Sequence, residues 1–396
     1  MGLTPARVLV AHNFYQWRGG EDAVVEAEVE LLRGHGHVVE LFARHSREAA
    51  GIHPAKLACD AVWSTATTRR CAELIDSFRP DVVHLHNTVP LISPSIVWAA
   101  RKAAVPVVQT LHNFRLLCPQ GMLLRDGHIC EACVGKLPWR SVAYGCYRRS
   151  RGQSAVMTAA AGVHGILGTY RRGISKFIVL SEFAKGKFVA GGLPGARIVV
   201  KPNFVDLPPA SEAGIRTGGL FVGRLSEEKG TRLLAEAATA AGVPIDVVGE
   251  GPDENRLRAV SNLHLLGRAD PAEVYRRMRT ASFLVVPSVS HETFGRVVVE
   301  AYACGLPVIA GRLGALEELV ISGTTGLLVG PGSAQALAQA IRWATDHPDD
   351  LRIWGRQARA RYEQYFSAAR NYRVLSAIYE DVVAAPHSVH STVTMP

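Results

Sequence analysis

Two glutamates flank a short glycine-containing segment in the second half of the chain. Glu292 and Glu300 stand eight positions apart in HETFGRVVVE, residues 291–300. On one continuous α-helix, this spacing would place the side chains about 80° apart around the axis and separate them by about 12 Å of rise. Two carboxylates so placed cannot share a proton. The spacing raises the question of which single object would need an acid at each end of a gap of this size.

Cations follow a predicted strand of the same half. FVGRLSEEKG, residues 221–230, reads as a strand that leads into Gly223 and Arg224 and, five residues later, Lys229. Gly223 permits close approach of a ligand to the backbone, and two cations at a strand end can neutralise a diphosphate. The alternative interpretation is a solvated turn between a strand and a helix.

Histidines stand at two strand ends of the first half. QTLHNFRLLCP ends a strand at His112, and VVHLHN places His84, His86 and Asn87 at the end of another. A strand-end histidine is usually structural, and a role in a functional site is the alternative. His86 and Asn87 are candidates for contact with an acceptor.

Four of the seven cysteines lie close together in the sequence, in the pattern C-x11-C-x2-C-x12-C. They are Cys118, Cys130, Cys133 and Cys146. A C-x2-C knuckle with two flanking cysteines predicts a structural zinc site that would order a segment too small and polar for its own core. Reduced thiols or packing cysteines are the alternative, and seven cysteines are too few for a disulfide scaffold in a chain of 396 residues.

Apolar segments alternate with helical patterns along the chain, which predicts an α/β fold with parallel strands and helices on both faces. In the first half we expect strands within 7–12, 37–43, 81–86, 105–112, 176–181 and 196–203, with helices at 21–34, 69–78 and from 94. Residues 113–150 read as an insertion and residues 203–219 as a linker. In the second half we expect strands within 219–225, 243–251, 263–268, 282–288, 306–311 and 325–330, and closing helices between 333 and 385.

The positive charge of the chain is concentrated in its middle third. The formal net charge is +9, and residues 101–201 hold 16 Lys/Arg against 3 Asp/Glu. Such a region suits nucleic acid, anionic lipid or a phosphorylated substrate. The N-terminus has no apolar stretch of signal-peptide length, and no run of about 18 apolar residues occurs. We therefore expect a cytoplasmic protein that does not span a membrane.

Three motifs occur in order, FVGRLSEEKG, VVGEGP and ETFGRVVVEAYACGLPVIAGRLGALEELVISGTTGLLV. Together they resemble the nucleotide-sugar-binding domain of retaining GT-B glycosyltransferases of family 4, closely over residues 219–330 and loosely over most of the chain. The cysteine-containing insertion resembles that of a bacterial subfamily. The resemblance implies two doubly wound, Rossmann-like domains that face a central cleft. They are an acceptor-side domain, 1–204, with the insertion 113–150, and a donor domain, 205–370; a C-terminal helix and tail, 371–396, packs back on the first domain.

The resemblance also implies roles for individual residues. Glu292 binds the donor sugar, Glu300 binds the ribose, and the diphosphate lies between them against a helix N-terminus. His112 faces the reacting carbon of the sugar and stabilises positive charge on its ring, so that His112 and Glu292 are the expected catalytic residues. The other expected donor contacts are Gly19, Gly20, Gly223, Arg224, Lys229, Gly267, Arg268, Thr293, Phe294 and Gly295. Thr293 stands where many relatives have glycine.

The implied activity is hexosyl transfer with retention from a nucleoside diphosphate sugar, UDP or GDP, in cell-surface polysaccharide or glycolipid synthesis. No catalytic cofactor is expected, and the chain has no D-x-D motif to hold a divalent metal. The acceptor is open, with a lipid-linked molecule and peripheral membrane contact as expectations. Nucleic acid is not expected, because no recognised module occurs. The alternatives are a GT-B sugar-nucleotide epimerase and a non-catalytic sugar-nucleotide-binding adaptor, which would not need His112.

Overall fold

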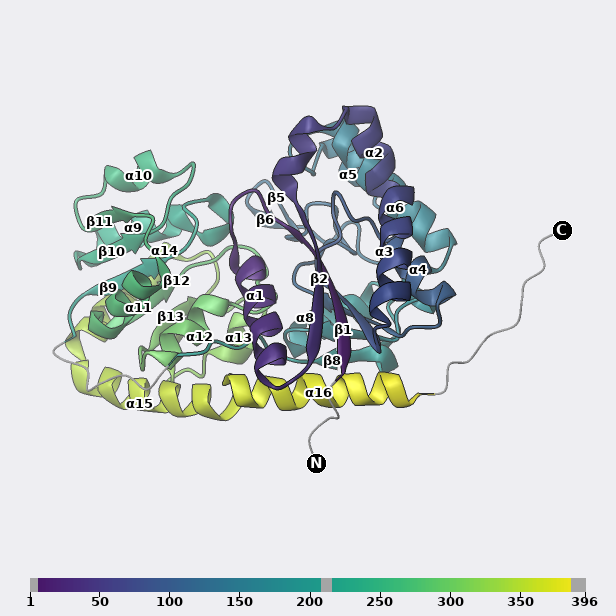
Figure 1. The fold of residues 1–396 in the computed structure, drawn as a ribbon. Helices are drawn as coiled ribbons and strands as arrows, with labels where there is room; N and C mark the ends of the chain where they lie inside the picture. Colours follow the sequence, from purple (N-terminus) through teal and green to yellow (C-terminus); the bar gives the residue numbers. More distant parts are fainter. Residues whose placement is uncertain (1–5, 208–215, 386–396) are drawn as a thin grey trace.

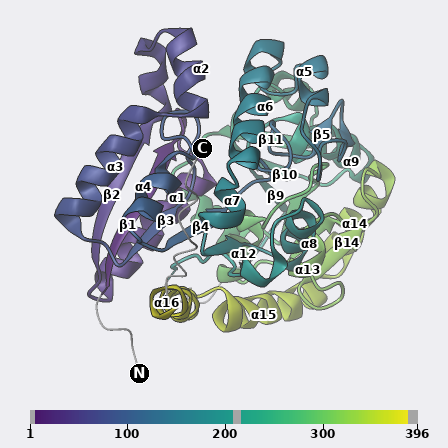
Figure 2. The ribbon, with the colours of Figure 1, turned by 90° about the vertical axis from the view of Figure 1, so that its right-hand side faces the viewer.

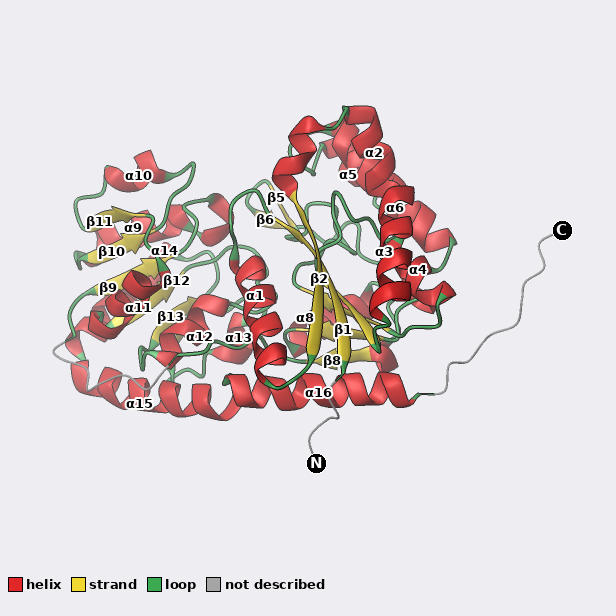
Figure 3. Ribbon diagram, viewed as in Figure 1, coloured by secondary structure: helices red, strands yellow, loops and turns green. Residues whose placement is uncertain are grey.

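Two parallel sheets of six strands each organise the protein (Figures 1 and 3), in a computed structural model that describes residues 6–207 and 216–385. The first sheet has the order β2-β1-β3-β4-β7-β8. Its strands are β1 Arg7–Phe14, β2 Val38–His45, β3 Val82–Leu85, β4 Val107–Leu111, β7 Lys176–Val179 and β8 Ile198–Val200. The helices of this half are α1 Gly20–Gly34, α2 Pro54–Val62, α3 Thr65–Phe78, α4 Ile96–Lys102, α5 Arg140–Tyr144, α6 Arg151–Ile166, α7 Thr169–Arg172 and α8 Glu182–Ala190, with 3₁₀ turns η1 Ser46–Gly51 and η2 Gly195–Arg197.

The second sheet has the order β11-β10-β9-β12-β13-β14, so the strand order reverses between β9 and β12. Its strands are β9 Gly219–Val222, β10 Ile245–Val248, β11 Leu263–Gly267, β12 Phe283–Val286, β13 Val308–Gly311 and β14 Gly326–Val329. The helices of this half are α9 Thr231–Ala241, α10 Glu254–Arg258, α11 Pro271–Thr280, α12 Arg296–Ala303, α13 Leu316–Leu319, α14 Ala334–Asp346, α15 Pro348–Tyr365 and α16 Ala368–Ala384, with the 3₁₀ turn η3 Glu227–Lys229. Doubly wound sheets bind ligands beyond the strand ends where the order reverses.

The predicted fold class is confirmed, and its physical cause is visible in the strands. The central strands β3, β4, β12 and β13 are buried along their whole length. Helices cover both faces of a parallel sheet, so its strands are continuous apolar runs rather than alternating ones. The sequence patterns that predicted these strands are of this kind.

Some elements were not predicted. The insertion contains helix α5 and a short hairpin, whose strands β5 Leu124–Arg125 and β6 His128–Ile129 have two residues each. Helix α2 was also missed, as was α6, which packs against both α2 and α5. Among the helices of the described chain, none has the length and apolarity that crossing a bilayer requires.

The last two helices connect the two halves. In Figure 1, α15 and α16 (yellow) run one after the other below both sheets, and Figure 2 shows α16 end-on beneath the first half. Leu375 and Tyr379 of α16 belong to the same apolar cluster as Val8 and Val10 of β1. Ala358 of α15 packs in the core of the second half. The domain boundary expected near residue 205 stays a prediction, since residues 208–215 lie outside the described chain, as does the tail after 385.

Candidate active site

A cavity of about 340 Å³ lies between the two halves, at the point where the strand order of the second sheet reverses. Nine of the residues expected at a donor site line it: Gly20, His112, Gly223, Lys229, Glu292, Thr293, Phe294, Gly295 and Glu300. The other four, Gly19, Arg224, Gly267 and Arg268, are not among its lining residues. We call this space the donor cavity.

Lys229 and Glu292 form an ion pair on the wall of the donor cavity. Lys229 Nζ lies 2.6 Å from Glu292 Oε1, and the Ser288 hydroxyl donates to the same oxygen at 2.9 Å. Gly230 makes this approach possible: its φ is +73°, and a Cβ there would lie 1.9 Å from the carbonyl oxygen of Pro287. Burial alone would raise the pKa of Glu292, but the Lys229 ammonium and the Ser288 hydroxyl hold it below its usual value. The pair is therefore ionised at neutral pH.

Glu300 is the fifth residue of α12, which begins at Arg296. Its carboxylate is 3.2 Å from Arg296 Nε. Burial raises the pKa of Glu300, and Arg296 and a hydrogen bond from Tyr275 oppose this shift only in part. A buried carboxylate with few protein partners can accept hydrogen bonds from ligand hydroxyls.

The turn between the two glutamates joins the halves of the protein. The Thr293 hydroxyl donates to the carbonyl oxygen of His112 at 2.7 Å, and the Ser181 hydroxyl donates to the carbonyl of Thr293 at 2.8 Å. Gly295 then caps α12 with a φ of +87°, and a Cβ there would lie 2.8 Å from the Leu316 side chain. Thr293 thus adds a hydrogen bond from the second half to the backbone of His112 in the first.

His112 directly follows β4 and lines the donor cavity. Its Nε2 lies 2.9 Å from Nδ1 of His86, and the two rings stack with centroids 5.2 Å apart. Burial, with His86 assisting, lowers the pKa of His112 to about 4. The ring is therefore neutral at pH 7 and is suited to hydrogen bonding and charge stabilisation rather than to proton donation.

The two glycines of WRGGED have different surroundings. The N–H of Gly19 donates to Asp22 Oδ2 at 2.9 Å, and Asp22 also contacts His12 Nε2 at 2.9 Å. Gly19 is thus occupied in capping α1, and only Gly20 of the pair lines the donor cavity. The carbonyl of Gly20 accepts from Arg296 at 3.4 Å, a second contact between the halves.

Besides Gly19, three expected donor contacts are not among the residues that line the donor cavity. Arg224 is exposed directly after Gly223. Gly267 has a φ of +70°, and its carbonyl accepts from the N–H of Gly249 at 2.8 Å. Arg268 is exposed. Their roles stay predictions.

A second cavity, of about 480 Å³, lies within the first half, and we call it the acceptor cavity. Glu21 and His112 are the two residues that line both this cavity and the donor cavity. The Tyr15 hydroxyl donates to Glu21 Oε2 at 2.8 Å, which holds the carboxylate in place. Glu21 was not among the residues predicted from the sequence, although it directly follows Gly19 and Gly20. The lining also includes His86, Asn87, Gln109, Asn113, Arg115, Lys136, Leu137, Met157, Ile166, Tyr170 and Arg171.

The four clustered cysteines are free thiols. Burial and the neighbouring thiols of Cys118, Cys130 and Cys146 raise the pKa of Cys133, so the four side chains share one region. They are nevertheless not among the groups of potential metal ligands that lie within 4.8 Å of one another in the described residues. The one such group is Glu28, His84 and His86 in the first half.

Comparison with known proteins agrees with the resemblance seen in the motifs. Residues 18–208 match the family described as Glycosyltransferase Family 4, and residues 216–347 match Glycosyl transferases group 1. The chain is 35% identical over 157 residues to D-rhamnosyltransferase WbpZ of Pseudomonas aeruginosa, a match that covers 38% of this chain and 41% of that protein. It is 27% identical to glycogen synthase of Mycobacterium tuberculosis, over 81% of this chain and 70% of that protein. The match to the first of these relatives thus spans less than half of its length.

A solved structure shares the architecture. Anabaena HepE in complex with UDP-glucose superposes with a TM-score of 0.67 and 19% identity, over 95% of this chain and all of that one. At this identity the likeness shows the fold alone.

Proposed function

Because the chain belongs to glycosyltransferase family 4, with the GT-B fold, we propose that it is a retaining, metal-independent hexosyltransferase that uses a nucleoside diphosphate sugar. The observation that carries the proposal is the meeting of the donor and acceptor cavities at Glu21 and His112. A sugar held in the donor cavity would present its reacting carbon to an acceptor hydroxyl held in the other.

The charged groups of the donor cavity suit the two ends of such a ligand. The Thr293–Gly295 segment precedes α12, where backbone N–H groups favour an anion, and Lys229 adds a cation. Glu292 then faces the sugar and Glu300 the ribose. In the reaction, the bond from the sugar carbon to the diphosphate oxygen breaks and the bond to the acceptor oxygen forms on the same face. The proton of the acceptor hydroxyl passes to the departing diphosphate.

The nucleotide and the enzymatic activity can be tested together. In a panel of nucleotide sugars, those of UDP or of GDP should raise the melting temperature of the protein, because a ligand stabilises the folded state by RT ln(1 + [L]/Kd). The same sugars should be hydrolysed slowly without an acceptor. Stabilisation without hydrolysis or transfer would favour a non-catalytic adaptor, and interconversion of the sugar without transfer would favour an epimerase.

Glu300→Gln should weaken donor binding more than it slows the chemical step. A hydrogen bond to a charged group contributes about 1.5–3 kcal/mol, so we expect the donor KM to rise about 10- to 150-fold with a smaller change in kcat. The raised pKa of Glu300 adds a pH signature. Donor affinity should be full above this pKa and fall as the pH drops through it, at a higher pH than for an ordinary glutamate, whereas the variant should lose this dependence. A loss confined to kcat contradicts the ribose role.

For the cysteine cluster we propose structural zinc. Four free thiols share a segment whose own regular structure is a short hairpin and one helical turn, and a metal would draw their sulfur atoms together. We expect about one zinc per chain in protein purified without added metal, and loss of order in residues 113–150 on chelation with both sheets intact. Metal analysis decides this, and a content below about 0.2 per chain favours reduced thiols.

We also propose that an exposed surface next to the acceptor cavity contacts anionic membranes. Trp139 and Tyr144 are 60% and 59% exposed there, and Ile166 at the end of α6 is 88% exposed. Exposed cations occur in the same part of the sequence: Lys136, Arg140, Arg148, Arg149, Arg151, Arg171 and Arg172. Tyr170 and Lys176 belong to the same basic third of the sequence but are engaged elsewhere, since Tyr170 lines the acceptor cavity and Lys176 pairs with Asp381 at 2.8 Å.

Co-sedimentation with liposomes tests the membrane proposal. Each basic residue near an anionic surface contributes about 1 kcal/mol, so the protein should bind anionic liposomes at low salt and release them near 1 M salt. Arg148→Glu/Arg149→Glu should weaken binding at least tenfold. Arg352→Glu/Arg356→Glu, the same charge change on exposed positions of α15, is the matched control. Equal binding to anionic and neutral liposomes, or no binding to either, contradicts the proposal.

A further inference from the structure

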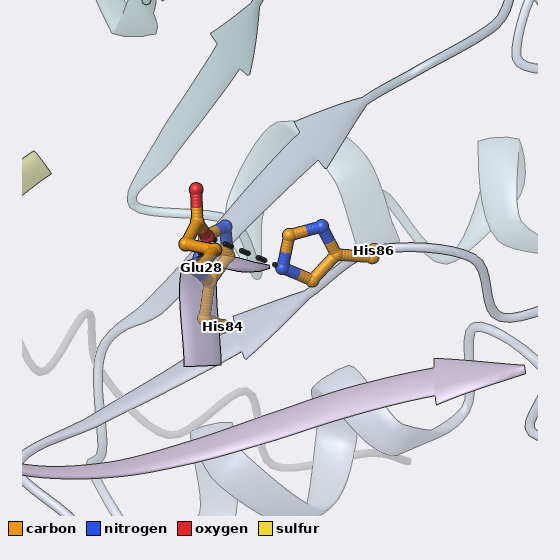
Figure 4. A group of neighbouring side chains, drawn as sticks. All are labelled: Glu28, His84 and His86. Atoms are coloured by element: carbon orange, nitrogen blue, oxygen red, sulfur yellow. Dashed lines mark ion pairs between the residues drawn. The ribbon is translucent and has the colours of Figure 1, made fainter. Parts of the chain in front are cut away.

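A buried network of ionisable groups lies behind His112. Glu28 projects from α1, His84 lies in β3 and His86 directly follows that strand, and their side chains converge (Figure 4). Lys201, which follows β8, is buried with them, and its Nζ lies 2.8 Å from Glu28 Oε2. None of Glu28, His84 and Lys201 lines either cavity.

Glu28 is ionised in this network. Burial alone would raise its pKa, but Lys201 and the two histidines hold the pKa well below its usual value. An ionised carboxylate only accepts hydrogen bonds. The Lys201 ammonium already neutralises Glu28, which leaves little attraction for a metal cation among the three converging side chains.

Two buried atoms of the network have no hydrogen-bond partner among residues 6–207 and 216–385: Glu28 Oε1 and His86 Nε2. They lie 3.5 Å apart, along the dashed line in Figure 4. A nitrogen lone pair facing a carboxylate would be repelled, so His86 Nε2 carries the hydrogen. Burial lowers the pKa of His86 to about 3, so its neutral ring has a single N–H and its Nδ1 is an acceptor.

The position of the hydrogen on His86 determines the position of the hydrogen on His112. Its Nδ1 lies 2.9 Å from His112 Nε2, and two lone pairs cannot face each other at that distance. We infer that Glu28, acting through His86, holds His112 in the Nε2–H form, so that the Nδ1 atom of His112 is the ring's hydrogen-bond acceptor. Glu28 is thus a positioning residue for the proposed reaction, on which this inference about its purpose rests.

The tautomer matters because the two forms of His112 offer opposite chemistry. A lone pair on Nδ1 can accept a hydrogen bond from a sugar hydroxyl and stabilises positive charge that develops on the sugar. An N–H at the same place would donate instead and would oppose that charge. A buried carboxylate that sets the tautomer of a catalytic histidine can affect the rate by several orders of magnitude.

The first test uses the wild-type protein and needs no activity. Two-bond ¹H–¹⁵N correlation spectra of protein labelled at histidine report which ring nitrogen carries hydrogen, and His112→Gln assigns the signal. We expect hydrogen on Nε2 and none on Nδ1 of His112. Hydrogen on Nδ1 overturns the inference, even if transfer or donor hydrolysis is observed. If His112 has the expected tautomer but the protein neither binds nor turns over a sugar nucleotide, the proposed function is contradicted and the inference about the tautomer stands.

The second test removes the carboxylate. Glu28→Gln alone leaves Lys201 buried without its partner and endangers folding. Glu28→Gln/Lys201→Met removes both charges with little change in volume. We expect a mixture of His112 tautomers and a kcat for donor hydrolysis at least tenfold lower, with the donor KM within threefold of wild type. An unchanged tautomer with unchanged kcat overturns the inference.

Tyr379→Phe is the matched control. The Tyr379 hydroxyl lies 2.7 Å from His84 Nδ1, in the same network but away from His86. His84 Nδ1 also lies 3.2 Å from Glu28 Oε1, so loss of the hydroxyl perturbs the surroundings of Glu28 while both partners of the Glu28–His86 contact remain. We expect wild-type tautomer and kcat within threefold. A loss as large as that of the double variant would show that the network acts only through packing, and would overturn the positioning role.

Discussion

Lys229→Met should lower kcat/KM for the donor about 30- to 900-fold, which corresponds to about 2–4 kcal/mol of transition-state stabilisation. Lys229 lines the donor cavity and comes from the FVGRLSEEKG motif that begins within β9. Its positive charge would oppose the negative charge that develops on the diphosphate as the sugar leaves. The substitution also frees Glu292 from its partner at 2.6 Å. Glu292→Gln alone and Lys229→Met/Glu292→Gln complete a double-mutant cycle, which separates the coupling of the two side chains from the loss of each one.

Two further variants calibrate the effect. Arg224→Ala should lose a similar amount, because Arg224 directly follows a cavity-lining glycine and its exposed side chain can turn toward the diphosphate. Arg232→Met is the control, since Arg232 is an exposed cation on α9 that pairs with Glu236 at 2.8 Å. It should leave activity within threefold. Lys229→Met with activity in the same range would end the assignment of Lys229 to the diphosphate.

Features that depend on residues close together in the chain could be predicted from the sequence. Buried parallel strands are continuous apolar runs, and these were found. Helix α6 was missed because apolar side chains such as Val163 and Ile166 are exposed on it, so it lacks the polar face by which a surface helix is recognised. The capping of α1 by Asp22 is also local, and an acid three residues after Gly19 was an available signal.

Contacts between distant residues were beyond such reasoning. Lys229 and Glu292 were each expected at the donor site, but their ion pair joins positions 63 residues apart. The stacking of His86 on His112 needs the pairing of β3 with β4, which places the two strand ends side by side. Glu21 became a candidate site residue only once the structure showed that both cavities are lined by it. Strand register and cavity shape arise from packing of the whole fold, and no motif records them.

His112→Ala should separate binding from chemistry. The neutral ring lies where the two cavities meet, so its loss should remove stabilisation of the positive charge on the sugar while the diphosphate and ribose contacts remain. We expect kcat to fall about 100- to 1,000-fold, with the dissociation constant for the donor within threefold of wild type, since interactions made mainly in the transition state affect kcat rather than binding. Single-turnover kinetics together with calorimetric titration of the donor measure the two quantities separately. His264→Ala, at an exposed histidine on β11, controls for the substitution itself and should change neither. A non-catalytic adaptor has no use for this ring, so a variant that binds and turns over like the wild type would remove His112 from the reaction centre and reopen that alternative.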